Sequence, residues 1–288
     1  MFTGFKAIAP GFSHSQTCQD AAEAVVLERV GIALVADGHG SRRHFRSELG
    51  ARFAVEVAKC AITQFIEMTE GRNSGFWDGS AETGGGLKKA DEYIRQLKSN
   101  IIYRWREAVL RDLNERAFTE EERDICADHH INPDAEDKND LVAVYGSTLL
   151  GAVITERFWF AIQIGDGACL IITEEGNAEA GIAKDAHLEF GHTTSLCSLD
   201  ALVSFRHRFG DIPIVGITVA SDGVTDSFIP EKYKDFTMRL LRRFVDNPDQ
   251  AERSLRDFLP KLSERGSNDD VSIAGVFDLS KGKAALER

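Results

Sequence analysis

The order of strand-like and helix-like segments is the feature that most limits the folds open to this chain of 288 residues. Short apolar runs typical of strands come first, and a long helical stretch follows. A second group of strands, two more helices and a last strand complete the chain. Strands and helices therefore do not alternate, which argues against a parallel doubly wound sheet built from β-α-β units. An antiparallel α+β arrangement with helices packed outside the sheets fits better.

The expected strands are apolar runs bounded by turn residues. They cover 2–9, 25–27, 32–36, 147–155, 158–164, 168–173, 201–209, 214–220 and 271–277, and 29–31 looks like the turn of a first hairpin. Short turn sequences at 156–157 and 165–167 separate three consecutive runs. This spacing predicts an antiparallel meander in which Gly165-Asp166-Gly167 forms a hairpin turn.

The expected helices show apolar residues every three or four positions. After position 40, one such stripe should face the core: Phe45, Leu49, Phe53, Val57, Ala61 and Phe65. Further helices are expected over 87–116, from 119, over 231–244 and over 249–259, the last one stopping at Pro260. The segments 70–86, 134–140 and 176–200 are polar and loop-like.

Bulk composition narrows the class of protein. The net charge of -12 argues against nonspecific nucleic-acid binding, which needs a basic surface. No run approaches the roughly 18 apolar residues of a membrane span, and no signal segment opens the chain. The five scattered cysteines include no CxxC pair, which favours reduced thiols over a zinc site. We expect a cytoplasmic protein with no membrane or nucleic-acid partner.

Four short acidic motifs follow one another along the chain, each with an aspartate at the end of an expected strand or beside one. They are Cys18-Gln19-Asp20-Ala21, Val35-Ala36-Asp37-Gly38-His39-Gly40, Ala220-Ser221-Asp222-Gly223 and Asn268-Asp269-Asp270-Val271-Ser272. Strand ends hold side chains rigidly, and gathered carboxylates suit hard divalent cations, which prefer oxygen ligands. Because these motifs span both ends and the late middle of the chain, one site must draw on all of it. We therefore expect a single domain over 1–288, with 70–140 as a helical and loop elaboration.

Each motif alone also has a simpler interpretation. Asp37 and Gly38 are common turn residues. This motif alone therefore supports a plain turn and a functional site equally. Asp222 could cap the helix that follows it, with Asp226 one turn further on. Asp20 is the weakest signal by itself. The combination carries more weight, because few folds need so many strand-end aspartates in this order.

The ordered motif set resembles the metal-dependent protein phosphatases, also called the PPM or protein phosphatase 2C family. The similarity covers most of the chain, from position 4 to 277, and the opening stretch looks more like compact bacterial members. The resemblance implies a four-layer α-β-β-α sandwich, in which two antiparallel sheets pack face to face under helices. It also implies two Mn²⁺ or Mg²⁺ ions at one edge of the sandwich.

The resemblance assigns metal ligands by position. Asp37 matches the aspartate that bridges the two ions, and Gly38 matches the glycine that lends its carbonyl oxygen. Asp222 and Asp269 match ligands of the second ion. Asp20 matches the first-motif aspartate, which acts near the metals partly through waters.

Three further residues complete the implied site. His39 matches the histidine proposed as general acid, and Asp166 and Asp226 match residues that hold a third, weaker ion in some members. The implied reaction is hydrolysis of phosphoserine or phosphothreonine in proteins by a water activated between two ions, without a covalent intermediate. A serine/threonine kinase system would supply the phosphorylated protein.

Two departures from the family pattern keep other functions open. Gln19 stands where the family commonly has an acid, and no arginine lies between positions 11 and 20 to hold phosphate. His14, Arg42 or Arg43 could take that role. The alternatives are a catalytically weak phosphatase-like binding module and a hydrolase of small phosphate esters.

Two segments are candidates for specificity. The segment 70–140 could contact a partner, and 176–200 could form a flap over the site. In that flap, Thr193, Thr194 and Ser195 are candidates for substrate contact, although a plain surface loop is the simpler interpretation.

Overall fold

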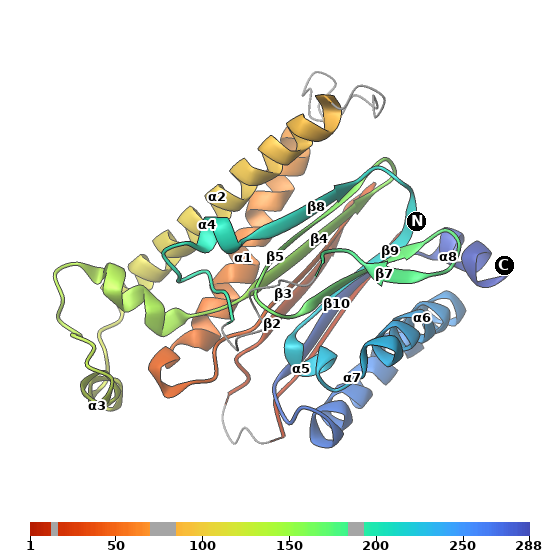
Figure 1. Ribbon diagram of the computed structural model, residues 1–288. Coiled ribbons are helices and arrows are strands. Elements are labelled where there is room, and N and C mark those ends of the chain that lie inside the picture. The colour runs from red at the N-terminus through yellow and green to blue at the C-terminus, as the bar shows by residue number, and fades with distance from the viewer. Residues whose placement is uncertain (13–16, 70–84, 184–192) are drawn as a thin grey trace.

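The structure is a computed structural model that describes residues 1–12, 17–69, 85–183 and 193–288 (Figure 1). Two antiparallel five-stranded sheets form its centre, with the strand orders β1-β10-β9-β6-β7 and β2-β3-β4-β5-β8. The strands are β1 (Phe2–Ala9), β2 (Ala21–Val26), β3 (Val30–Ala36), β4 (Leu149–Thr155), β5 (Trp159–Ile164), β6 (Ala168–Thr173), β7 (Ala178–Ala180), β8 (Arg206–Gly210), β9 (Ile214–Ala220) and β10 (Val271–Asp278).

Helices cover the outer face of each sheet, and this gives the expected four-layer α-β-β-α sandwich (Figure 1). The helices are α1 (Ser47–Thr69), α2 (Gly85–Glu115), α3 (Glu120–Asp128), α4 (Ala201–Ser204), α5 (Asp222–Thr225), α6 (Pro230–Asp246), α7 (Pro248–Arg265) and α8 (Leu279–Leu286), with the 3₁₀ helices η1 (Arg42–His44) and η3 (Lys138–Tyr145). The helices α1 and α2 lie on one side, and α6, α7 and α8 on the other.

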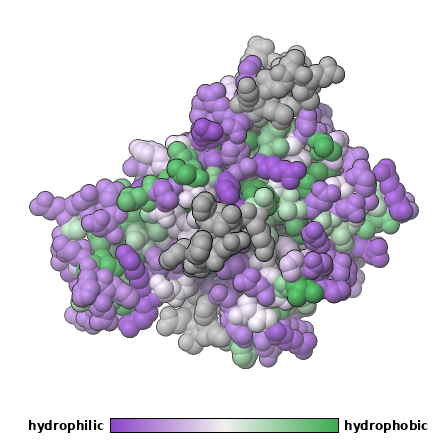
Figure 2. Space-filling view, in the orientation of Figure 1, coloured by the Kyte–Doolittle hydropathy of each residue, from purple (hydrophilic) through white to green (hydrophobic). Residues whose placement is uncertain are grey.

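The alternation of side chains along β3 shows why the run is apolar throughout. Ile32 and Leu34 face the layer of α1 and α2, whereas Ala33 and Val35 face the second sheet. All seven residues of the strand are buried. Burial of both faces of a strand requires a continuous apolar run. The outer surface seen in Figure 2 is by contrast mainly hydrophilic, with small hydrophobic patches between polar residues.

The expected meander is wrong at its second connection. β5 pairs with β4 and β8, while β6 lies in the other sheet beside β9. The segment 165–167 therefore carries the chain from one sheet to the other and is not a hairpin turn. Strands that follow one another in sequence often pair, but the apolar pattern alone does not identify the partner strand.

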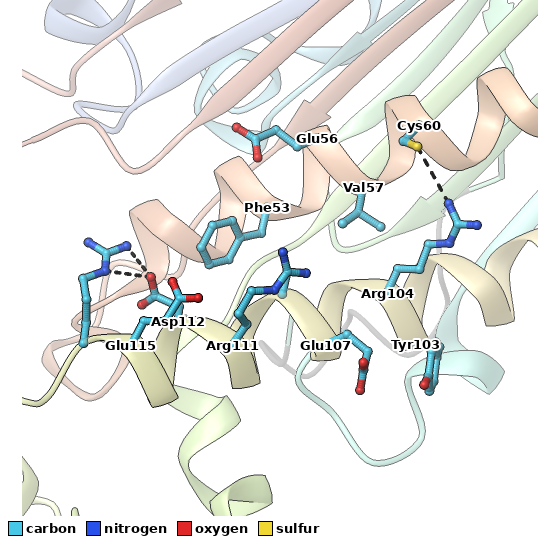
Figure 3. A pocket seen from close by; sticks show the side chains of 12 residues that line it. Phe53, Glu56, Val57, Cys60, Tyr103, Arg104, Glu107, Arg111, Asp112 and Glu115 are labelled. Carbon is cyan, nitrogen blue, oxygen red and sulfur yellow. Dashed lines mark hydrogen bonds and ion pairs between the residues drawn. The ribbon is translucent and has the colours of Figure 1, made fainter.

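The buried face of α1 agrees with the expected stripe only in part: Ala61 and Phe65 are buried, whereas Phe53 and Val57 are partly buried. Ala54, Ala58 and Ile62 pack on the sheet with almost no exposed surface. Phe53 and Val57 instead line a groove between α1 and α2 (Figure 3). The helix has two neighbours, a sheet and a helix, and its alanines allow the sheet to approach closely.

Other boundaries differ in the C-terminal half. α7 continues through Pro260 to Arg265, because the buried positions Leu255, Leu259 and Leu262 extend its apolar face past the proline. The expected strand at 201–209 is the short helix α4 followed by β8, and neither α8 nor η3 was expected. The first hairpin turns at 27–30, where the Leu27 N–H donates to the Val30 carbonyl. Within the described residues, no helix has the length and apolar character to span a membrane.

Candidate metal centre

Asp37 directly follows the buried strand β3, and its main chain is fixed on both sides by Thr148. The Asp37 N–H donates to Thr148 Oγ1 at 2.9 Å, and the Thr148 N–H donates to the Asp37 carbonyl at 2.8 Å. A rigid strand end of this kind holds a carboxylate in one place, which suits a metal ligand better than a mobile loop would.

Three carboxylates converge at this edge of the sandwich. Asp37, Asp166 and Asp222 each offer an oxygen within 4.8 Å of the others, and all three side chains are partly exposed. Asp37 comes from one sheet, Asp222 opens α5 after β9 of the other sheet, and Asp166 lies in the connection between the sheets. The arrangement explains why motifs far apart in sequence meet at one site.

Asp20 lies deeper than this trio, just before β2. Its side chain is 8 % exposed, and the side chains of Ser272, Ser221 and Asp37 lie near enough to its carboxylate to oppose the rise in its pKa. Burial raises the pKa of Asp20 to about 7, and the charge of Asp270 adds to the rise. These contacts do not offset burial, so the charged carboxylate is costly and a nearby cation would relieve that cost.

The trio itself shows the same electrostatic strain. Burial, followed by the charges of Asp20 and Asp222, raises the pKa of Asp37 well above its ordinary value. Burial and the charge of Asp166 raise the pKa of Asp222 to about 6. Carboxylates that repel one another in this way fit oxygen-preferring divalent cations, which remove the repulsion when they bind.

Gly38 occupies a position that accepts no side chain. A Cβ atom there would lie 2.7 Å from the Ser47 carbonyl oxygen and 2.8 Å from that of Gln19. The Gly38 N–H donates to the Gln19 carbonyl, which joins the first two acidic motifs. Glycine is therefore needed for close approach of the backbone, whether or not its carbonyl binds an ion.

The last two predicted ligands lie outside the trio. Asp269 is exposed in the loop before β10, and Asp226 is exposed at the end of α5. The negative charges of both help to raise the pKa of Asp222. They are therefore within electrostatic reach of the trio, although their side chains do not join it.

Asp270 was not singled out as a functional residue, yet it connects two of the motifs. It is 4 % exposed, and its two oxygens accept from the Gly11 and Gln19 N–H groups at 2.6 and 2.7 Å. The pair of adjacent acids before a buried strand was the available sequence signal. The sequence could not show which of the two points inward.

His39 lies at the same edge, beside a second histidine. Its ring centroid is 4.9 Å from that of His44. Burial, and after it the neighbouring His44, lowers the pKa of His39 to about 4, against an opposing effect from Asp166. The imidazole of the metal-free protein is therefore neutral at pH 7.

The candidate phosphate contacts differ in their surroundings. Arg42 pairs with Asp128 at 4.0 Å, whereas Arg43 is exposed and makes no ion pair with any residue that the structure describes. His14 lies outside the described residues. The Gln19 side chain is close to the second motif, because a Cβ on Gly40 would be 3.6 Å from Gln19 Oε1.

The segment that begins at Thr193 contacts the site through its hydroxyl groups. Thr193 Oγ1 donates to Asp166 Oδ2 at 2.5 Å, and Thr194 Oγ1 accepts from the Gly165 N–H at 2.9 Å. Ser195 Oγ donates to the Ser147 carbonyl at 3.1 Å. Thr193 and Thr194 therefore hold the connection that carries Asp166, and Ser195 joins the same segment to the residue before Thr148. Of the expected flap over 176–200, residues 178–180 form strand β7, which pairs with β6, and residues 184–192 lie outside the described part of the chain.

Comparisons with known proteins agree with this architecture. Residues 12–260 match the family model described as Protein phosphatase 2C. No curated protein sequence matches the chain. Among solved structures, the serine/threonine phosphatase Stp1 from Staphylococcus aureus is 17 % identical, with a TM-score of 0.57 over 96 % of this chain and 95 % of that one.

Two further structures have the same fold at similar distance. The catalytic domain of the phosphatase PstP, in complex with two manganese ions, is 17 % identical, with a TM-score of 0.52 over 96 % of this chain and 97 % of that one. PppA, a regulatory component of the T6SS in Pseudomonas aeruginosa, is 15 % identical, with a TM-score of 0.54 over 96 % and 97 %. At these identities the structures show a shared fold, and the family match covers most of the sequence. The chain belongs to the protein phosphatase 2C family.

Proposed function

We propose that the protein is a metal-dependent phosphatase that removes phosphate from serine or threonine residues of proteins. The observation that carries this proposal is the convergence of Asp37, Asp166 and Asp222 near the buried Asp20. Carboxylates that lie together at one edge of the sandwich and raise one another's pKa values form a site for cations. The family match gives the substrate class.

The ligands follow from position. Asp37 would contact both ions, Gly38 would offer its carbonyl, and Asp222 and Asp269 would hold the second ion. Asp20 would act near the metals, partly through water. Asp166 and Asp226 would hold a third ion. Bound Mn²⁺ or Mg²⁺ supplies Lewis acidity that lowers the pKa of water and offsets charge on the phosphoryl oxygens.

His39 would protonate the oxygen of the leaving serine or threonine. Its neutral state in the free protein is compatible with that role, because a bound phosphate dianion adds negative charge beside the ring and raises its pKa. Proton donation matters for an alkoxide leaving group, and a positioned side chain contributes about 10²- to 10⁴-fold to such a step.

The substrate would be a protein phosphorylated by a serine/threonine kinase. Arg43, exposed next to His44, is available to contact acidic groups near the phosphorylated residue. PstP, a phosphatase of the same fold, was solved with two manganese ions, which supports Mn²⁺ as the first metal to test.

The test is hydrolysis of a phosphothreonine peptide by the purified protein with Mn²⁺, with Mg²⁺ and with chelator. Asp37→Asn should abolish most activity and remain folded, while Asp257→Asn, an exposed change on α7, should retain it. Hydrolysis of p-nitrophenyl phosphate without peptide turnover would favour a small-ester hydrolase. Absence of all turnover from folded, metal-supplied protein would favour a binding module.

A further inference from the structure

His44 lies against the imidazole of His39, which is five positions earlier in the sequence. The ring centroids are 4.9 Å apart, and the ring planes are inclined at 60°. His44 ends the 3₁₀ helix η1, which lies in the chain between the His39 segment and α1. The contact places a second, partly buried imidazole beside the proposed proton donor.

The ring of His44 is held in one orientation. Its Nδ1 atom is 2.5 Å from the Ala143 carbonyl oxygen. A carbonyl can only accept, so Nδ1 carries the proton and the hydrogen bond fixes both the tautomer and the ring plane. Ala143 belongs to η3, which is joined to the start of α1 by the bond from the Arg46 N–H to the Val144 carbonyl at 2.9 Å.

Gly146 makes the contact between the two rings and the backbone possible. A Cβ atom at this position would lie 2.4 Å from His39 Cδ2 and 2.7 Å from His44 Nδ1. The Gly146 carbonyl accepts from the His39 N–H at 3.0 Å, and the Gly146 N–H donates to the Ala143 carbonyl at 3.0 Å. Both rings therefore pack against one short stretch of backbone that also fixes the His39 main chain.

We infer that His44 is a positioning residue, which holds the His39 ring in the orientation that delivers a proton to the leaving oxygen. The inference rests on the proposed phosphatase function. Without His44, the His39 ring would lose the surface that limits its rotation, while its main chain would stay in place. A misplacement of about 1 Å in a catalytic group can cost on the order of 10²-fold in rate.

Two substrates separate this role from a structural one. A phosphothreonine peptide has a poor alkoxide leaving group that needs a proton, whereas p-nitrophenolate leaves without one. His44→Ala should lower kcat for the peptide about 10- to 100-fold, and kcat for p-nitrophenyl phosphate less than about 3-fold. His44→Phe keeps a ring against His39 but lacks the Nδ1–H that fixes its plane, so it should show a smaller loss that is still selective for the peptide, even if the alanine variant does not fold.

A double-mutant cycle tests whether the effect passes through His39. If it does, His39→Ala and the combined His39→Ala, His44→Ala variant should hydrolyse the peptide at the same rate. His129→Ala removes an exposed imidazole from the same neighbourhood and should leave both activities unchanged.

Two results would overturn the inference while leaving the phosphatase function intact. One is an equal loss on both substrates in the His44 variants. The other is a further loss in the double variant that multiplies the two single losses. Failure of the wild-type protein to hydrolyse either substrate with metal would instead remove the proposed function itself.

Discussion

Asp269 and Asp270 are adjacent in the chain but lie in opposite environments. Asp270 is buried and accepts from the Gly11 and Gln19 N–H groups, so it joins the first acidic motif to the last. Asp269 is exposed, and its charge acts on Asp37 and Asp222. One carboxylate therefore serves the fold, and its neighbour serves the candidate metal centre.

Asparagine substitutions should separate these roles. Asp270→Asn replaces an acceptor of two charge-assisted bonds by an amide whose NH₂ faces a donor, and should lower the free energy of unfolding by about 2 kcal/mol. Asp269→Asn should leave unfolding nearly unchanged but raise the Mn²⁺ concentration needed for half-maximal activity. Denaturant unfolding and Mn²⁺ titration measure the two effects. Similar unfolding of both variants would contradict the division.

The carboxylate cluster should make the metal-free protein less stable as the pH rises from 6.5 to 8. The pKa of Asp20 is raised to about 7 and that of Asp37 well above its ordinary value, so the folded state keeps protons that the unfolded state has already released. That contribution to stability is lost as the pH passes through the folded pKa values. We expect Asp20 alone to lower the free energy of unfolding by about 1 kcal/mol over this window, and Asp37 to add to that loss.

Between pH 6.5 and 8, the pH dependence of stability comes mainly from the carboxylates rather than from histidine or lysine side chains. The lowered pKa of His39 acts in the opposite direction, but mainly below pH 6.5, and the lowered pKa of Lys98, about 8, acts mainly above pH 8. Thermal unfolding in chelator measures the slope. Asp37→Asn should flatten it, and Mn²⁺ should stabilise the protein more at pH 8 than at pH 6.5. A slope that is the same in Asp37→Asn would contradict the assignment.

Arg46 should be the most costly charged residue to remove from the helical layer. Its side chain is 7 % exposed and bonds Glu122 at 2.7 and 2.9 Å and the Tyr145 hydroxyl at 2.8 Å, with Asp112 at 3.4 Å. It thereby ties α1 to α2, α3 and η3. Arg46→Met removes the cation that pairs with Glu122 and neutralises charge beside the buried Asp112, and should lower the free energy of unfolding by about 3 to 5 kcal/mol.

The neighbouring Arg42 provides the matched control. Its pair with Asp128 is 4.0 Å long, and both side chains are mostly exposed. Arg42→Met should cost less than about 1 kcal/mol. Denaturant unfolding of the two variants side by side compares a buried with an exposed ion pair on nearly the same segment. Equal losses would show that burial of Arg46 does not determine its contribution.

Sequence patterns predicted the layers well, because a strand that is buried on both faces appears in the sequence as a nearly continuous apolar run. β3 is apolar throughout, β9 is buried throughout with Thr218 as its polar residue, and an acidic residue follows each strand within two positions. The partner of β6 could not be predicted, because its side-chain pattern suits either sheet. Pro260 misled for a different reason: a missing N–H weakens one helical bond, but the buried leucines of α7 favour continuing the helix.

At the candidate site, too, the sequence identified some of the residues and missed the importance of another. The sequence drew attention to Asp37 and Asp222, which end strands, but gave Asp166 only a minor role in a presumed hairpin turn. The structure places Asp166 within the trio, since the connection between the sheets passes over the edge where the other two lie. Which side chains meet depends on strand pairing, and the sequence did not show that pairing.

Thr193→Val tests whether the segment after residue 192 helps to shape the metal centre. The Thr193 hydroxyl donates to Asp166 Oδ2, which orients that carboxylate toward Asp37 and Asp222. Loss of a group that orients a ligand typically lowers metal affinity 10- to 100-fold, so we expect about 10-fold weaker Mn²⁺ binding with unchanged unfolding. Calorimetric titration measures it. Thr225→Val, which removes a bond to the Asp222 main-chain carbonyl only, is the control. Equal affinities in both variants would show that Asp166 is positioned without Thr193.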